Sequence, residues 1–164
     1  MYQKLNNIFR SWIKFWVKIV IFINYSKNSK EVTKLEKFLR KFYGVLVFKA
    51  PSSIEPGSNY IKDLKNNIIN CDLFIPIISS NSIKSSITQQ EIGIAVSYNK
   101  DIFPIVLGKI SEKELGFLIN KQYIRYKDPS LKKKLKNKIL KKYLTGYLIF
   151  IVVVVIWIYF RFFR

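Results

Sequence analysis

Hydrophobic residues form five short runs along the middle of the chain. They cover residues 18–24, 45–49, 72–79, 102–107 and 122–126. Most are rich in β-branched residues, and their positions are apolar on both faces of a strand. Strands of this kind are typical of a parallel sheet that is covered on both sides. We therefore expect a five-stranded parallel sheet with helices on its two faces.

The segments between these runs show helical periodicity instead. Residues 30–43 place their apolar side chains on one stripe, and Gly44 stands where a C-terminal cap belongs. Residues 58–70 form a shorter stripe, with Ser58 as a candidate N-cap. Alternating strands and helices predict a three-layer α/β sandwich. The other expected helices lie near 87–98, at 111–119 with a weaker pattern, and at 129–142.

The C-terminal end has a different character. Residues 143–160 carry no charge, and as a helix they would be about 27 Å long, close to the ~30 Å hydrocarbon core of a membrane. Seven lysines precede them between positions 131 and 142, and the positive-inside rule places such a segment in the cytoplasm. We expect a single-pass tail anchor with the domain in the cytoplasm. The alternative is a buried core helix.

The N-terminal end is basic and aromatic, and its apolar residues fall on one helical face. An interfacial helix on the same membrane is the favoured interpretation. A helix packed on the domain and a second membrane span are the alternatives. The expected organisation is an amphipathic helix at 1–17, an α/β domain at 18–128, a lysine-rich juxtamembrane helix at 129–142 and a transmembrane helix at 143–160.

The charge distribution supports contact with a membrane. The chain has 29 Lys+Arg against 10 Asp+Glu, a net charge of +19. All ten acids lie between residues 31 and 128, so the excess positive charge sits in the two ends. A nucleic-acid-binding domain would instead show a basic face of its own. We therefore expect membrane lipid, and no nucleic acid, as a partner.

The residue types exclude several kinds of site. The chain has no histidine and one cysteine, Cys71, so a Ser-His-Asp triad and a His/Cys zinc cluster are impossible, and no metal site is expected. No glycine-rich dinucleotide fingerprint or phosphate-loop lysine motif occurs. A receiver domain would need acids where Asn24 and Ser79 stand. Any catalysis must rest on carboxylates, hydroxyls, amides, lysines or backbone groups.

Ligands of open α/β sheets bind at the carboxyl ends of the strands. The segments that follow the first three strands are polar, small or glycine-bearing, and the third leads to Glu91. Ser86 and Gln89 fit a capping box, which would start the helix near Ile87. Side chains on a helix lean toward its N-terminus, so Glu91 in the second turn would point toward the strand ends. It is either a solvated helix charge or the working group of a site.

Four stretches together resemble the TIR domain family. "VIFINYSKNS" is similar to its first-strand box, and "VFKAPSSIEPGSNYIKDLKNNI" to its second strand and BB loop. "CDLFIPIISSNSIKSS" is similar to the third strand with the following loop, and "ITQQEIGIAV" to the αC helix. The resemblance covers about residues 18–126 and is closest in style to bacterial TIR proteins of anti-phage defence. It implies a flavodoxin-like sheet in the order 2-1-3-4-5.

The resemblance also implies a reaction. In catalytic members a glutamate on the αC helix, here Glu91, serves the cleavage of the nicotinamide–ribose bond of NAD+. NAD+ is then a substrate, and no cofactor is implied. Breaking that bond builds positive charge on the ribose, which one carboxylate can stabilise. The candidate substrate-binding residues are Asn24, Tyr25, Pro56, Gly57, Ser58, Ser85 and Ile87.

Several of these candidates have structural alternatives. Tyr25 could stack on a base or simply close the sheet, and Ser85 could be a helix-start residue. Pro56-Gly57 forms a turn in any interpretation. The family often has serine at Asn24 and tryptophan at Ile87, and an acid near the start of the BB loop.

The sequence supports three functions. The first is a membrane-anchored NAD+ glycohydrolase or cyclase in prokaryotic immune signalling, which would act through TIR–TIR self-association and through an effector that detects a nucleotide signal. The second is a non-catalytic TIR adaptor that only associates with other TIR domains, which Ile87 and the missing loop acid favour. The third, an effector acting on a host, has least support because nothing indicates secretion.

Overall fold

The computed structural model describes residues 18–25, 29–49, 60–111, 114–115, 118 and 122–162. The chain divides into two compact units. One is Val20–Leu131, and the other contains the helical residues from Lys132 onward. Each is described by itself below.

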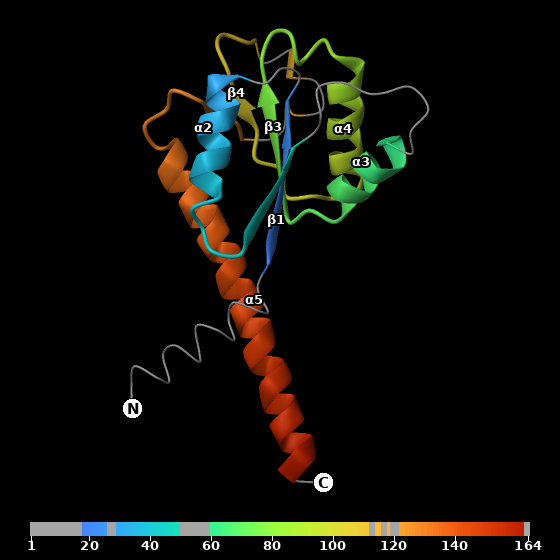
Figure 1. Ribbon diagram of the computed structural model, residues 1–164, viewed down its shortest axis with the longest axis vertical. Helices are drawn as coiled ribbons and strands as arrows, with labels where there is room; N and C mark the ends of the chain where they lie inside the picture. Colours follow the sequence, from blue (N-terminus) through green and yellow to red (C-terminus); the bar gives the residue numbers. More distant parts are fainter. Residues whose placement is uncertain are drawn as a thin grey trace. The chain divides into compact units, whose positions relative to one another are not determined.

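A five-stranded parallel sheet forms the centre of the first unit (Figure 1). The strand order β2-β1-β3-β4-β5 is the flavodoxin-like order that the resemblance to the TIR family implies. In the register of β1 and β3, Asn24 lies opposite Pro76. The strands are β1 (Ile19–Asn24), β2 (Val45–Lys49), β3 (Leu73–Ile78), β4 (Ile105–Val106) and β5 (Ile124–Arg125).

The last two strands are shorter than the apolar runs that predict them. Ile102 pairs with Phe74 only through an isolated bridge, and β4 proper begins at Ile105. Pro104 explains the interruption, because proline has no N–H to donate to a neighbouring strand. Its carbonyl still accepts a bond from the Ile124 amide, at 3.0 Å.

Helices cover both faces of the sheet. Helices α3 (Tyr60–Ile69) and α4 (Ser86–Ser97) contact each other on one face, and α2 (Lys30–Leu39) lies on the other (Figure 1). Strand β3 is buried along its whole length, as a central strand of such a sandwich must be. The Phe22 and Phe74 rings stack with 5.7 Å between their centroids and join β1 to β3 in the core.

Helix α2 ends earlier than its apolar stripe. The stripe predicts a helix to residue 43, but α2 ends at Leu39 with Arg40 as its C-cap. Gly44 does have a left-handed backbone, with φ of 68°, but it introduces β2 rather than capping the helix. Phe42 continues the stripe from a turn, because its ring packs edge-on against Phe38 at 5.4 Å.

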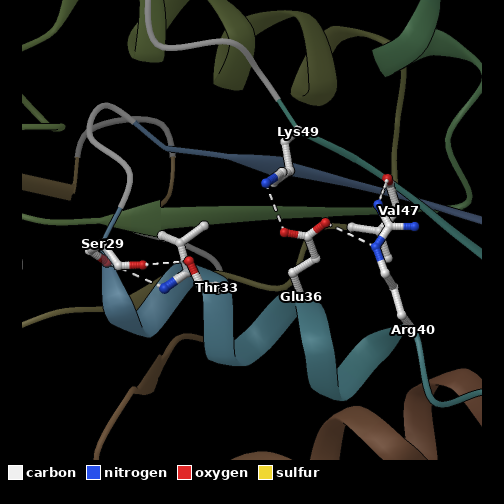
Figure 2. Close-up of polar contacts among 7 residues, drawn as sticks. Ser29, Thr33, Glu36, Arg40, Val47 and Lys49 are labelled. Carbon is white, nitrogen blue, oxygen red and sulfur yellow. Dashed lines mark hydrogen bonds and ion pairs between the residues drawn. The ribbon is translucent and has the colours of Figure 1, made fainter.

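A polar cluster ties α2 to the edge strand β2 (Figure 2). The Glu36 carboxylate bridges the Lys49 ammonium at 2.8 Å and the Arg40 guanidinium at 2.9 Å. Arg40 also donates to the Val47 carbonyl at 3.0 Å. Lys49 is the last residue of β2, so this cluster fixes the point where the chain leaves the strand.

The second unit contains the long helix α5 (Leu131–Phe162) from Lys132 onward. The sequence suggests a lysine-rich helix followed by a separate membrane helix, but α5 runs through both segments without a break. From Leu131 to Ile156 it is long and apolar enough to cross a membrane. Large exposed side chains follow one another along its second half, namely Leu144, Leu148, Ile149, Ile151, Val152, Val153, Val155, Ile156 and Tyr159.

The remaining predicted helices are partly outside the described residues. Ser58, the proposed N-cap, lies outside the described residues, and α3 is described from Tyr60. Within 111–119, Glu114 and Leu115 adopt a 3₁₀ conformation. The interfacial helix predicted for residues 1–17 also lies outside the described part of the chain.

Candidate active site

The carboxyl end of β1 meets the second turn of α4 through one pair of side chains. The Asn24 amide Nδ2 donates a hydrogen bond to the Glu91 carboxylate, Oε2. Both residues are 1% exposed. Glu91 therefore does not extend into solvent from the helix surface. It leans toward the strand ends, as the direction of helical side chains predicts.

The start of α4 positions this carboxylate. Ser85 is the N-cap, with an extended backbone, and its hydroxyl accepts a bond from the Thr88 amide at 3.4 Å. The capping box predicted from Ser86 and Gln89 is wrong by one residue. The Gln89 side chain instead donates to the Ile83 carbonyl at 2.8 Å, which ties α4 to the preceding loop.

Burial changes the acidity of Glu91. Loss of solvation disfavours the charged form and raises the pKa of Glu91 from 4.5 to about 7, although the hydrogen bond from Asn24 opposes the shift. The group is then close to half ionised at neutral pH. Surface carboxylates of the same domain behave in the opposite way, since the hydroxyl and backbone N–H of Ser111 lower the pKa of Glu114. A carboxyl poised near 7 is suited to acid–base or electrostatic work.

Asn24 has an unused hydrogen-bonding atom at the same place. Its Oδ1 is buried and has no hydrogen-bond partner in the described structure. An unpartnered buried acceptor costs about 1–3 kcal/mol, so folding alone does not favour this arrangement. A ligand hydroxyl or N–H that reached Asn24 would satisfy the atom. Rotation of the Asn24 amide by a half turn would instead let Oδ1 accept a hydrogen bond from the O–H of the protonated Glu91 carboxyl.

The other predicted site residues are found in different settings. Tyr25 follows Asn24 and is 9% exposed, so it contributes to closing the sheet. Ile87 is 41% exposed in the first turn of α4, so it belongs to the surface rather than the core. Ser85 is a helix cap, as its structural alternative predicts. Pro56, Gly57 and Ser58 lie outside the described residues.

Electrostatic contacts extend from this edge to β2. The pKa of Lys49 is raised, chiefly by its hydrogen bond to Glu36, and the Tyr25 hydroxyl also contributes. Tyr25, which follows β1, therefore interacts electrostatically with the last residue of β2.

One group of polar residues was not predicted from the sequence. Lys109 follows β4, Arg125 is the last residue of β5, and Lys127 follows β5; all three line a hollow at the carboxyl edge of the sheet. The sequence carried a signal for this group, because Lys109 and Lys127 follow predicted strands and Arg125 lies near the end of one. It was missed because only the segments after the first three strands were weighed. Among the described residues, no cluster of three His, Cys, Asp or Glu side chains could hold a metal ion.

Comparison with known proteins places this geometry in a family. A family model described as TIR domain matches residues 21–140. Among solved structures, the Clostridium botulinum CMP N-glycosidase BcmB is 24% identical over 71% of this chain and 98% of its own, with a TM-score of 0.54. The TIR domain of the Toll-related receptor TRR-2 from Hydra magnipapillata is 18% identical over 77% of this chain and 98% of its own, with a TM-score of 0.53.

These structural likenesses show a shared fold. A search of curated protein sequences finds no match. The family match covers the whole sheet and reaches from β1 into the first turns of α5. It therefore includes both Asn24 and Glu91, and it agrees with the observed strand order. The chain belongs to the TIR domain family.

Proposed function

We propose that this protein is a membrane-anchored TIR N-glycosidase that cleaves the nicotinamide–ribose bond of NAD+ by hydrolysis or cyclisation. The observation behind this proposal is the buried Asn24–Glu91 pair at the carboxyl edge of the sheet. A buried carboxyl with a pKa near 7, beside an unpartnered amide oxygen, is costly for the fold and useful for a reaction.

The chemistry needs one anion. As the bond between C1 of the ribose and the pyridinium nitrogen breaks, its electron pair goes to the ring and nicotinamide leaves neutral. Positive charge develops on the sugar, and the Glu91 carboxylate would stabilise it. A water then adds to C1 and releases a proton, or a group of the same nucleotide attacks in the cyclase variant. Asn24 would hold the carboxylate and offer Oδ1 to a sugar hydroxyl.

The substrate itself would favour the working form of Glu91. The pyridinium ring of NAD+ is positively charged, and a nearby positive charge lowers the pKa of a carboxyl group. Binding would therefore shift Glu91 toward the anion at the moment when the anion is needed. A raised pKa in the free protein is compatible with this mechanism.

A second substrate class is favoured by the same raised pKa. Cytosine leaving a nucleotide such as CMP takes the electron pair with it, and needs a proton to leave as a neutral base. The protonated form of Glu91 could supply that proton below about pH 7. A structural neighbour is named as a CMP N-glycosidase, which makes CMP the appropriate probe of this alternative.

The test uses the full chain in lipid nanodiscs, with NAD+ and CMP offered separately from pH 5.5 to 9. Released nicotinamide and cytosine are measured by chromatography. For NAD+ we expect the rate to rise with pH toward a plateau, because the anion acts, whereas cytosine release by the acid would fall. Glu91→Gln should abolish release. Glu114→Gln, which removes an exposed carboxylate, should keep it.

Three results would contradict the proposal. Release of cytosine alone would replace NAD+ as the substrate. Equal release by wild type and Glu91→Gln would move the chemistry to another residue. No release of any base, even from concentrated protein, would favour the adaptor that acts only through TIR–TIR association.

The anchor and its biological setting belong to the same proposal. Helix α5 begins with seven exposed or half-exposed lysines and continues as an apolar helix. Lysines at one end of a span favour the cytoplasmic side, so the TIR domain would face the cytoplasm and its NAD+. Loss of NAD+, or a nucleotide product detected by an effector, would suit prokaryotic defence against phage.

A further inference from the structure

The hollow lined by Lys109, Arg125 and Lys127 opens at the carboxyl edge of the sheet, on the part that β4 and β5 form. Its volume is about 540 Å³, within the range of ~300–1,000 Å³ typical of small-molecule sites. Residues 106–109, at the end of β4 and after it, and residues 125–127, at the end of β5 and after it, line the hollow together with Glu31 of α2. Glu91 and Asn24 are not among its lining residues.

The charged groups around this hollow are mostly cations. Lys109, Arg125 and Lys127 face one carboxylate, that of Glu31. Arg125 donates one N–H to the Gly108 carbonyl at 3.2 Å, which joins the two loops and positions the planar guanidinium. That bond needs only one of the five N–H donors of the group. Guanidinium and ammonium groups together are a favourable setting for a phosphate.

The rest of the wall is apolar or aromatic. Val106 is buried at the end of β4, and Leu107 and Tyr126 border the hollow beside it. Tyr126 keeps its proton at neutral pH, since burial and then the nearby Glu31 raise its pKa. The wall therefore offers apolar side chains and a phenol beside the cations. Glu31 can accept hydrogen bonds from sugar hydroxyls.

The backbone of the loop after β4 is shaped for this arrangement. Gly108 has φ of 79°, a left-handed conformation that favours glycine. A Cβ at this position would meet no atom within 4 Å, so the reason for a glycine is the backbone conformation of the turn and not a lack of space. The turn brings Lys109 into the lining of the hollow.

We propose that this hollow binds the phosphate of a mononucleotide, at a site separate from the Glu91 carboxylate. The phosphate lies between the two lysines and Arg125, and the base rests on the apolar wall. A product or metabolite bound there would touch the loops after β4 and β5 without entering the cleavage site. The inference concerns binding and stands whether or not the protein is a glycosidase.

The test is equilibrium binding to the full chain in nanodiscs of zwitterionic phosphatidylcholine, which presents no net lipid charge. The probes are AMP, adenosine and inorganic phosphate, titrated by calorimetry. We expect saturable AMP binding, at least tenfold weaker adenosine binding because the phosphate is missing, and weaker inorganic phosphate binding because the base is missing. Added salt should weaken AMP binding.

Matched charge reversals locate the site. The double variant Lys109→Glu/Lys127→Glu should weaken AMP binding at least tenfold. The control Lys37→Glu/Lys41→Glu makes the same change of net charge at exposed positions around the other end of α2, and should change affinity less than twofold. Thermal unfolding of both variants checks that each is folded.

Glu91→Gln separates the two sites. It should leave AMP affinity unchanged, even if it abolishes base release. Absence of saturable AMP binding, or equal affinity in both charge-reversal variants, would overturn the proposal. Loss of AMP binding in Glu91→Gln would assign the nucleotide to the Glu91 site instead.

Discussion

The ionisation of a single residue, Glu91, links the stability of this domain to its proposed activity. The carboxyl is 1% exposed, and its pKa is about 7 in the folded chain against 4.5 for an unperturbed glutamate. The folded state therefore binds the proton more tightly than the unfolded state does. The contribution of Glu91 to the free energy of unfolding is then greatest below pH 4.5. It decreases as the pH rises toward 7 and above. The ionised form needed to stabilise a ribosyl cation is the form that the fold disfavours.

Glu91→Gln should accordingly stabilise the domain at high pH. The neutral amide avoids the cost of a buried anion, which by linkage amounts to roughly 3 kcal/mol above pH 7. Thermal unfolding from pH 5 to 8 should show a difference in Tm that grows with pH. Glu114→Gln is the control and should show no such growth. A constant difference between Glu91→Gln and wild type would mean that Glu91 titrates as an ordinary surface acid.

Asn24→Ala tests the partner of this carboxyl. The hydrogen bond from Asn24 lowers the pKa of Glu91, so its loss should raise that pKa further. The pH midpoint of NAD+ cleavage should then move upward, with the high-pH plateau reduced. Asn24→Ser keeps a hydroxyl donor and should give the smaller shift. A uniform loss of activity at every pH would indicate damage to packing rather than to the acidity of Glu91.

The direction of Glu91 could be predicted from the sequence, but its contact with Asn24 could not. Helix geometry alone points a second-turn side chain toward the strand ends. The two residues are 67 positions apart, and only the parallel pairing of β1 with β3 brings them together. The burial of Glu91 could not be predicted either, because a glutamate that lies between two glutamines and an apolar run is equally compatible with a surface position and a core position. Ile87 shows the converse, an apolar residue that is exposed.

At the scale of elements, α2 and α4 have the same kind of start and different tasks. Ser29 accepts a bond from Val32 N at 3.3 Å, and Ser85 accepts one from Thr88 N at 3.4 Å. Helix α2 connects to β2 through Glu36, whereas α4 presents Glu91. Because the two serine caps are equivalent, removing each in turn can separate an effect on stability from an effect on the position of Glu91.

Ser85→Ala and Ser29→Ala should each lower the free energy of unfolding by about 1 kcal/mol, the usual value for a serine N-cap. Only Ser85→Ala should also lower kcat for NAD+, because the first turns of α4 orient Glu91. Unfolding and steady-state kinetics of both variants measure this. Equal kinetic losses would show that the cap of α4 has no special part in positioning. A rise of KM alone in Ser85→Ala would make the hydroxyl a ligand contact.

The order and type of the elements were accessible from the sequence, while several of their ends were not. The apolar runs and stripes predicted the five strands and the helices between them, and the resemblance to the TIR family implied the order of the strands in the sheet. The end of α2 was missed because the stripe continues through Phe42, which packs on Phe38 from a turn. The shortness of β4 follows from Pro104, whose missing N–H affects pairing without changing hydrophobicity.

At the scale of the whole molecule, the sequence predicts a tether as well as a domain. Helix α5 passes through the lysine-rich and apolar segments as one element, so no separate hinge divides them within the described helix. If α5 spans a membrane as proposed, it would confine TIR domains to a thin layer along that membrane. Confinement raises their effective concentration without any new contact surface. Weak TIR–TIR association would then depend on surface density.

We therefore expect the specific activity of the full chain to rise faster than linearly with its density in vesicles. Protein is reconstituted at increasing protein-to-lipid ratios, and nicotinamide release per domain is measured at constant total protein. One chain per nanodisc provides the dilute limit and should be least active. Substitution of Pro56 and Gly57, at the turn of the BB loop in the family pattern, by bulkier residues should suppress the rise while Glu91 remains present. The same activity per domain at every density, nanodiscs included, would show that each TIR domain works alone and that the anchor sets only its location.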